Sequence, residues 1–256
     1  MRSKIFQSMI ILILITLSLV SDARTQFYQN SYALVIGINE YPSPNWSRLN
    51  YARKDAQGVA AFLTSRGFEV TQLYDTQATR TRIISEMHKI AKKVEENDRI
   101  LVFFAGHGHT ERFGEQDAGY IVPYDGTYDS ATFISMEEIR SQSTRMGTAK
   151  HQLFIMDACY GGLLGTRAGA LDPSIPHYLQ AITQRDARQI ITAGGKNQQV
   201  LDRGPGGHSV FTGHILKAIK DGMADINGDG YITFAELSSY VVPAASNSYQ
   251  TPAPGT

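Results

Sequence analysis

Segments with the pattern of buried strands alternate along this chain with segments that have the period of a helix. The strand segments are short and largely apolar, whereas in the helical segments apolar residues recur every three or four positions. Five strands are predicted at residues 32–39, 68–74, 100–104, 153–156 and 189–192. Five helices are predicted at residues 51–66, 79–96, 135–146, 209–221 and 233–242. This alternation predicts an α/β fold, a doubly wound three-layer α/β/α sandwich on a mostly parallel sheet.

The N-terminus departs from this pattern. Arg2 and Lys4 precede an apolar stretch from Met9 to Val20, and small residues at Ser21 and Ala23 suit a cleavage site. Spanning a bilayer takes about 20 apolar residues, so a signal peptide over residues 1–23 is favoured over an uncleaved membrane anchor. We therefore expect a secreted or periplasmic protein with no stable membrane insertion after signal removal.

The remaining sequence predicts one domain over residues 31–245. Between the predicted strand at 100–104 and the helix at 135–146 come a polar loop and then residues 119–124, expected as a short excursion at the sheet edge. Residues 246–256 form a Ser-, Pro- and Gly-rich tail, expected to hold no element and to come from a truncated chain. Lys and Arg number 24, as do Asp and Glu, so the charge gives no reason to expect a nucleic-acid partner.

Two of the predicted strands end in residues that can carry chemistry. One runs into Asp157 and Cys159, the only cysteine of the chain, and the other into a histidine, His107, between two glycines. In open α/β sheets, ligands bind beyond the carboxyl ends of the strands. An imidazole beside a thiol raises the fraction of nucleophilic thiolate. The two strand ends therefore predict a Cys-His dyad.

Two other interpretations of these residues stay open. A free cysteine is commonly a small buried apolar residue, which is the alternative for Cys159. His107 and His109, with Asp157 or Cys159 as further ligands, would make a chemically reasonable zinc site. The chain has no paired cysteines to support that metal site.

The segments Phe104–Gly108 and Asp157–Gly161 resemble the two catalytic motifs of caspase-like cysteine peptidases, in particular the bacterial metacaspase relatives. The histidine stands 52 positions before the cysteine, close to the spacing found in caspases. The resemblance extends to residues 32–39, 49–56, 188–194 and 208–212, and covers about residues 31–245. It implies a caspase-type sandwich with a mostly parallel sheet of about six strands.

The resemblance implies a cysteine endopeptidase acting on protein or peptide substrates through a thioester acyl-enzyme. Cys159 would be the nucleophile and His107 the general acid and base, and no cofactor is required for this chemistry. The backbone amides of Gly108 and Cys159 would form the oxyanion hole.

Substrate preference follows from two acidic residues. Asp55 and Asp157 fall where metacaspase relatives that cut after basic residues carry an acidic pair. Two carboxylates in a partly desolvated pocket would favour a guanidinium, so we expect cleavage after Arg, with Lys weaker. Asp55 has an alternative as a solvated helix residue, and Asp157 as a turn or capping carboxylate. Arg167, in the glycine-rich segment after the nucleophile, is then a candidate autocleavage site.

Residues 225–236 match a calcium-binding EF-hand loop. The expected ligands are Asp225, Asn227, Asp229, the Tyr231 carbonyl, Thr233 and Glu236. A simpler interpretation is that Asp229-Gly230 makes a turn and that Thr233 with Glu236 forms a capping box. Both interpretations of this loop stay open, so bound Ca²⁺ is an expectation and not a requirement.

Two further functions compete with the peptidase. One is a non-catalytic caspase-fold module with a binding or regulatory role that could respond to calcium; the presence of both dyad residues argues against it. The other is a hydrolase of the same fold that acts on non-peptide acyl bonds.

Overall fold

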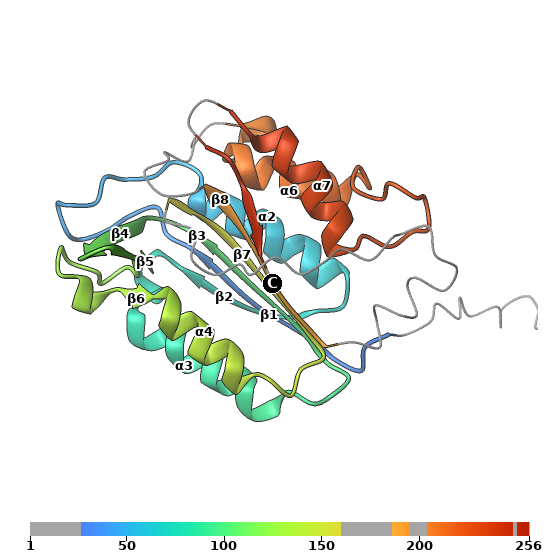
Figure 1. Cartoon of the computed structure of the whole chain (residues 1–256), viewed down its shortest axis with the longest axis horizontal. Coiled ribbons are helices and arrows are strands. Elements are labelled where there is room, and N and C mark those ends of the chain that lie inside the picture. The colour runs from blue at the N-terminus through green and yellow to red at the C-terminus, as the bar shows by residue number, and fades with distance from the viewer. Residues whose placement is uncertain (1–26, 160–185, 195–203, 248–249, 256) are drawn as a thin grey trace, which may run out of the picture.

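A six-stranded sheet runs through the middle of the molecule, with helices on both of its faces (Figure 1). The computed structural model describes residues 27–159, 186–194, 204–247 and 250–255. The strand order is β2-β1-β3-β7-β8-β9, with the first five strands parallel and β9 antiparallel to β8. The predicted α/β/α sandwich is therefore confirmed. The strands are β1 (Ser31–Gly37), β2 (Glu69–Tyr74), β3 (Arg99–Ala105), β7 (His151–Cys159), β8 (Ala187–Gly194) and β9 (Ala253–Gly255).

The helices form the two outer layers. In Figure 1, α3 and α4 cover one face of the sheet, while α2, α6 and α7 cover the other. Four of the five begin at a hydroxyl residue (Thr79, Ser135, Ser209 or Thr233) whose side-chain oxygen accepts a backbone N–H of the first turn. The helices are α2 (Ala52–Ser65), α3 (Arg80–Lys93), α4 (Met136–Arg145), α6 (Val210–Lys220) and α7 (Phe234–Ala245), with 3-10 turns at Asp75–Gln77, Ser130–Thr132 and Pro205–Gly207.

Each face of the sheet has its own hydrophobic core because successive side chains of a strand point to opposite faces. On β3, Phe104 joins the core under α3 and α4, and Phe103 joins the core under α2, α6 and α7. Both phenylalanines have no exposed area. Burying such a side chain contributes about 1.5–3 kcal/mol, which explains why the central strands are apolar on both faces.

Close packing at Gly37 places α2 against the carboxyl end of β1. A Cβ at Gly37 would lie 2.6 Å from both the carbonyl oxygen of Ala52 and the Cβ of Ala56. Any larger residue would push the first turn of α2 away from the sheet. The glycine therefore helps to hold Asp55, in that turn, near the carboxyl edge.

The region after β3 differs from the prediction. Instead of a polar loop and an excursion at the sheet edge, the chain forms a second, three-stranded sheet of order β4-β5-β6. The polar residues failed to signal this hairpin because its strands are mostly half-exposed or exposed and lack a continuous apolar run. The strands are β4 (Gly108–Phe113), β5 (Gln116–Ile121) and β6 (Ile134–Ser135).

The C-terminal tail was wrongly predicted to hold no element. Ala253–Gly255 pairs with β8 as the sixth strand of the main sheet. Pairing there satisfies backbone groups of β8 that would otherwise lie at an open edge. Pro254 is tolerated in this strand because an edge strand has one side free of ladder bonds.

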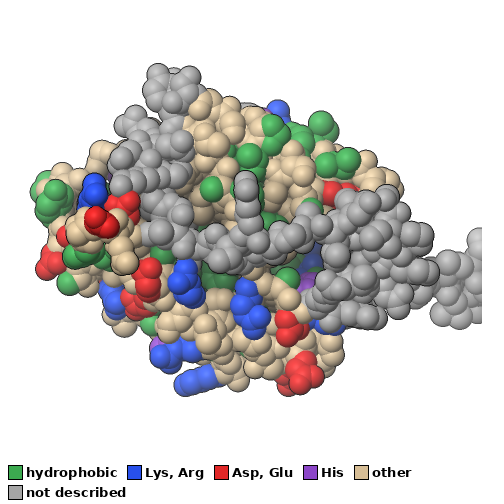
Figure 2. Space-filling view, viewed as in Figure 1, with side chains coloured by type: hydrophobic (Ala, Val, Ile, Leu, Met, Phe, Trp, Pro, Cys, Tyr) green, Lys and Arg blue, Asp and Glu red, His purple; other side chains and the backbone are tan. Residues whose placement is uncertain are grey.

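Acidic and basic side chains lie intermingled on the face of the molecule shown in Figure 2. Within the described residues, no helix is both long enough and apolar enough to cross a bilayer.

Candidate active site

β3 and β7 end side by side at the carboxyl edge of the sheet. Ala105 of β3 is paired with Asp157 of β7, and the backbone N–H of Gly106 donates to the Asp157 carbonyl at 3.2 Å. His107 and Cys159 each follow this pair by two residues. The two motifs therefore bring their backbones to the same edge at corresponding positions. The side chain of Cys159 itself lies outside the described part of the chain.

The imidazole of His107 is oriented by a backbone carbonyl. Its Nε2 lies 2.7 Å from the carbonyl oxygen of Ser47. A carbonyl can only accept, so this contact assigns the ring proton to Nε2 and leaves Nδ1 as the nitrogen that can take a proton. The ring is thus held as the tautomer that a general base needs.

Two aromatic residues of the loop after β1 pack against this imidazole. The ring centroids of Tyr41 and Trp46 lie 5.0 Å and 5.4 Å from that of His107. The indole Nε1–H of Trp46, the only tryptophan of the chain, donates to the Thr127 carbonyl at 2.8 Å. The aromatic pair therefore limits the rotation of the histidine side chain.

The hydroxyl of Tyr41 also fixes the histidine backbone. It accepts the backbone N–H of His107 at 2.9 Å and donates to the Val122 carbonyl at 3.4 Å. Burial raises the pKa of Tyr41, so the hydroxyl stays protonated and keeps both roles. A Cβ at Gly106 would lie 2.7 Å from the Tyr41 hydroxyl, which explains the glycine before His107.

His109, the rival histidine, lies in a different environment. It stands in β4 opposite Tyr120, and its ring packs on Phe133 and Trp46 at centroid distances of 5.4 Å and 6.0 Å. Among the described residues, no three His, Cys, Asp or Glu side chains are grouped so that they could hold a metal ion.

Asp55 and Asp157 come together through Ser209. The Ser209 hydroxyl donates to Asp157 Oδ2 at 2.5 Å, and its backbone N–H lies 3.2 Å and 3.3 Å from the two oxygens of Asp55. Asp55 is 1% exposed and Asp157 5%. Asp55 is therefore buried, so the alternative that it is a solvated helix residue is wrong. Two carboxylates from α2 and β7 meet at the start of α6.

Further donors from the same segment complete this network. The Thr212 hydroxyl donates to Asp157 Oδ2 at 2.5 Å, and His208 Nδ1 lies 2.6 Å from Asp55 Oδ1. The positive end of the α6 dipole also favours negative charge here. Burial, Lys54 and Lys220 lower the pKa of His208, so at neutral pH its imidazole is neutral and donates Nδ1–H to Asp55.

Gly108, an expected oxyanion donor, is the first residue of β4 and follows His107 directly. Cys159 pairs in the backbone with Gly194 of β8, after a register shift that begins at Met156. The amide of Gly108 thus directly follows His107, and that of Cys159 lies at the end of β7.

The loop at residues 225–236 joins α6 to α7. The Asp225 carboxylate accepts backbone N–H groups of Asp229 and Gly230 at 3.1 Å and 2.9 Å. Asn227 Oδ1 accepts the Asp229 N–H, and Asp229 Oδ1 accepts the Tyr231 N–H.

At the end of this loop, the capping box between Thr233 and Glu236 is formed in both directions. The predicted turn and capping box are therefore present, with Gly228 and Gly230 at positive φ. The side chain of Glu236 is directed at Thr233 and not gathered with Asp225 and Asp229.

Some predicted features fall outside the described residues. The signal peptide at 1–23 and the autocleavage candidate Arg167 are among them, and both stay predictions.

Several residues of the site were missed by sequence reasoning. Tyr41, Trp46 and Ser47 lie in a loop without periodicity, and Ser47 acts through its backbone. His208, Ser209 and Thr212 lie in a segment that resembled the family without showing a role. The one signal that could have found them is their position at the start of a helix: His208 and Ser209 lie just before α6, and Thr212 lies in its first turn.

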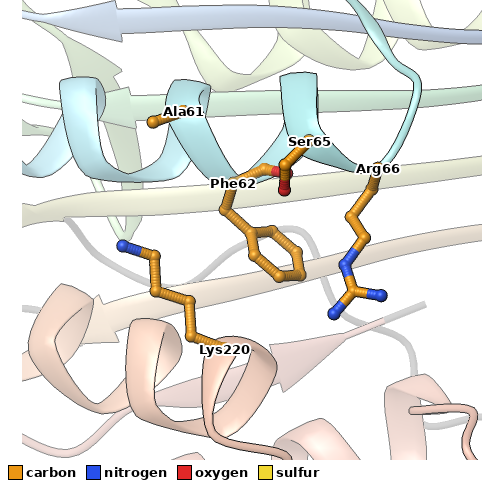
Figure 3. A pocket seen from close by; sticks show the side chains of 5 residues that line it. All are labelled: Ala61, Phe62, Ser65, Arg66 and Lys220. Atoms are coloured by element: carbon orange, nitrogen blue, oxygen red, sulfur yellow. The ribbon is translucent and has the colours of Figure 1, made fainter.

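A cavity of about 370 Å³ lies between the C-terminal ends of α2 and α6 (Figure 3). Both helices begin near the Asp55–Asp157 network, so the cavity lies at the opposite ends of the helices from this network. Arg66 and Lys220 stand at helix C-termini, where positive charge is favourable without any ligand. The lining residues are Ala61, Phe62, Ser65, Arg66 and Lys220.

The sequence model of the caspase domain, the peptidase family C14, matches residues 30–252. This chain belongs to the caspase family. A probable protease of a Desulfuromonadales bacterium is 33% identical over 153 residues, covering 50% of this chain. The caspase chain spans only 18% of the length of that relative.

The fold is shared with a solved structure. Protein GSU0716 from Geobacter sulfurreducens matches with a TM-score of 0.63 over 89% of the caspase chain and 94% of its own, at 22% sequence identity. This likeness concerns the fold alone. In the caspase chain, the two motifs that follow β3 and β7 lie at one edge of this shared fold.

Proposed function

We propose that this caspase-family chain is a secreted cysteine endopeptidase that hydrolyses peptide bonds after arginine and, more weakly, after lysine. The observation that carries the proposal is the register of β3 and β7, whose ends lead to His107 and Cys159 at one edge. Membership in the caspase family supports peptide-bond chemistry at this edge. The buried acidic pair of Asp55 and Asp157 supports the basic preference.

In the proposed reaction, Cys159 attacks the carbonyl carbon of the scissile bond as a thiolate. The thiol proton goes to Nδ1 of His107, which is the nitrogen turned away from the Ser47 carbonyl. The imidazolium then gives this proton to the departing amine, leaving a thioester on Cys159. A water molecule attacks the thioester as His107 accepts its proton, and the carboxylate product leaves.

The negative charge that develops on the substrate oxygen needs donors fixed in advance. Backbone N–H groups are suited to this because they require little reorganisation during the reaction. Gly108 and Cys159 are the proposed donors, since Gly108 directly follows His107 at the start of β4 and Cys159 is the last residue of β7. The tight packing around Gly106 and Tyr41 would hold this backbone still.

The preference for arginine is proposed from charge and burial. Two carboxylates from different elements meet at Ser209, and charge-assisted hydrogen bonds in a desolvated site are stronger than neutral ones. A guanidinium can bind two carboxylates at once with its fixed fork of donors, whereas an ammonium is a point charge. Arginine is therefore expected to be favoured over lysine.

Fluorogenic peptides that differ only at the residue before the scissile bond test this preference. We expect kcat/KM for Arg to exceed that for Lys, and to exceed that for its uncharged analogue citrulline by about 10²-fold, as expected for two charged hydrogen bonds. The Cys159→Ala protein serves as the control for contaminating proteases. Preferential cleavage after aspartate would overturn the proposed specificity.

Two parts of the proposal concern residues beyond the described ranges. Secretion is proposed from the charged and apolar pattern of residues 1–23, and autocleavage at Arg167 from the basic preference. Both belong to the same function, because a secreted caspase that cuts after arginine could process its own glycine-rich segment.

Calcium binding is proposed for the loop at residues 225–236. All of its candidate ligands are oxygen atoms, as Ca²⁺ prefers. Glu236 is 5% exposed, and its Oε1 has no hydrogen-bond partner among the described residues. For binding, the Glu236 side chain would turn from Thr233 towards Asp225 and Asp229, which would supply a partner for that oxygen.

Thermal unfolding with increasing CaCl₂ tests this loop. We expect the unfolding temperature to rise with calcium by mass action, with a Kd of about 10⁻⁴–10⁻³ M as in extracellular modules. Glu236→Gln should abolish this rise, whereas Asp221→Asn, just outside the loop, should leave it unchanged. An unfolding temperature that is independent of calcium up to about 10 mM contradicts the proposal.

A further inference from the structure

His208 shares the environment of the acidic pair although no part of the proposed reaction uses it. Its Nδ1 lies 2.6 Å from Asp55 Oδ1, and its side chain is 16% exposed, compared with 1% for Asp55. The imidazole is thus one of the groups that separate the Asp55 carboxylate from solvent.

The ring of His208 fits a narrow space lined by glycines. A Cβ at Gly58 would lie 3.2 Å from Cε1 of the imidazole, and a Cβ at Gly206 would lie 3.4 Å from Cδ2. Lys54 contacts the Gly206 carbonyl, which ties this turn to α2. The absence of side chains at both glycines lets the ring approach Asp55 closely from between α2 and α6.

A guanidinium of a substrate could not reach Asp55 while the imidazole covers it. A buried carboxylate that loses a hydrogen bond without a replacement is costly, so the bond to His208 is best exchanged for another donor. Arginine supplies such donors, whereas a short apolar side chain supplies none. The Asp55 carboxylate then has a hydrogen-bond donor from His208 in the free enzyme and from arginine when substrate is bound.

On the basis of the function proposed above, we propose that His208 is a specificity-determining residue that occupies Asp55 in the substrate-free enzyme and is displaced by the basic side chain of the substrate. His208 therefore competes with arginine for one carboxylate. Substrates with a short apolar residue at this position leave the histidine in place.

This competition strengthens as the pH falls. Burial and the positive charges of Lys54 on α2 and Lys220 on α6 lower the pKa of His208, so the neutral ring faces Asp55 at neutral pH. Once the ring is protonated below that pKa, it pairs with the carboxylate as a cation. KM for arginine substrates is then expected to rise on acidification through the titration of His208.

His208→Ala and His208→Gln test the competition with peptides that carry Arg or Ala before the scissile bond. We expect His208→Ala to lower KM for the Arg peptide about 10-fold, the factor that one lost hydrogen bond corresponds to, and to leave kcat/KM for the Ala peptide unchanged. His208→Gln keeps a donor to Asp55 but cannot become a cation. In this variant, KM for the Arg peptide should therefore rise less on acidification than in the wild type, because no histidine titrates beside Asp55.

If His208 only held Asp55 in place, KM for the Arg peptide would change in the opposite direction. In that case His208→Ala would raise KM for the Arg peptide and His208→Gln would restore it, which would overturn the proposal. If the alanine variant fails to fold, the Gln variant still decides, because a pH profile of KM identical to that of the wild type also overturns it.

Binding of N-acetyl-arginine amide to the Cys159→Ala protein separates this inference from the proposed function. We expect calorimetry to show tighter binding when His208→Ala is added, and the Cε1–H signal of His208 to shift when the probe binds. Unchanged affinity and an unmoved signal overturn the role of His208 even if arginine peptides are cleaved. Faster cleavage after another residue than after Arg and Lys would overturn the proposed function instead.

Discussion

Replacing Cys159 by alanine is expected to abolish peptide hydrolysis, and His107→Ala is expected to lower kcat by about 10²–10⁴-fold. Without the thiolate no thioester forms, and without the imidazole the thiol is mostly protonated at neutral pH. Initial rates on an arginine peptide, together with the unfolding temperature of each variant, measure this. His107 is only half-buried, and Cys159→Ala removes a single sulfur atom, so we expect both variants to fold.

His109→Ala is the matched control for the dyad. It removes a second histidine two residues away, in a ring cluster with Phe133 and Trp46. Because the proposed proton transfer uses only His107, His109→Ala should change kcat by less than about 10-fold. Iodoacetamide labelling of Cys159 at neutral pH should slow in His107→Ala and not in His109→Ala. Slow labelling that does not depend on His107 would favour a non-catalytic module of the caspase family.

The central fold could be predicted because its signal is local. Strands such as β1 and β3 are buried on both faces, so each appears in the sequence as a short apolar run. The helices show their apolar face and their capping residue in the sequence as well. Ala253–Gly255 gave no such signal, because a short edge strand with a proline derives its order from pairing with β8. The β4–β5 hairpin was missed for the related reason that its polar strands are stabilised mainly by backbone bonds.

The acidic pair and the dyad motifs could be proposed from sequence, but their surroundings could not. The Ser47 carbonyl contacts His107 across 60 positions, and a backbone atom leaves no trace in residue type. The contact of His208 with Asp55 spans 153 positions and depends on how α6 packs beside α2. Contacts of this kind depend on tertiary packing. The sequence predicts only the strand ends at which these residues meet.

Asp157→Asn is expected to lower the ratio of kcat/KM for arginine over citrulline about 10-fold, the share of one of the two charged hydrogen bonds. The amide keeps the shape and an acceptor for the hydroxyls of Ser209 and Thr212, so the start of α6 should stay in place. What is lost is the charge, and charge-assisted bonds to a guanidinium are about twice as strong as neutral ones. Asp55→Asn should act in the same direction, because its carboxylate meets the same serine.

Asp98→Asn provides the control for removing a buried carboxylate. Asp98 has no exposed area and accepts backbone N–H groups of Asn30 and Glu95, but it precedes β3 at the opposite edge of the sheet. Its substitution should lower the free energy of unfolding by about 1–3 kcal/mol and leave the Arg-to-citrulline ratio unchanged. A charge that binds substrate affects selectivity, whereas a charge that only anchors a helix affects stability. An unchanged Arg-to-citrulline ratio in Asp157→Asn and Asp55→Asn would therefore mean that these carboxylates serve only to anchor α6.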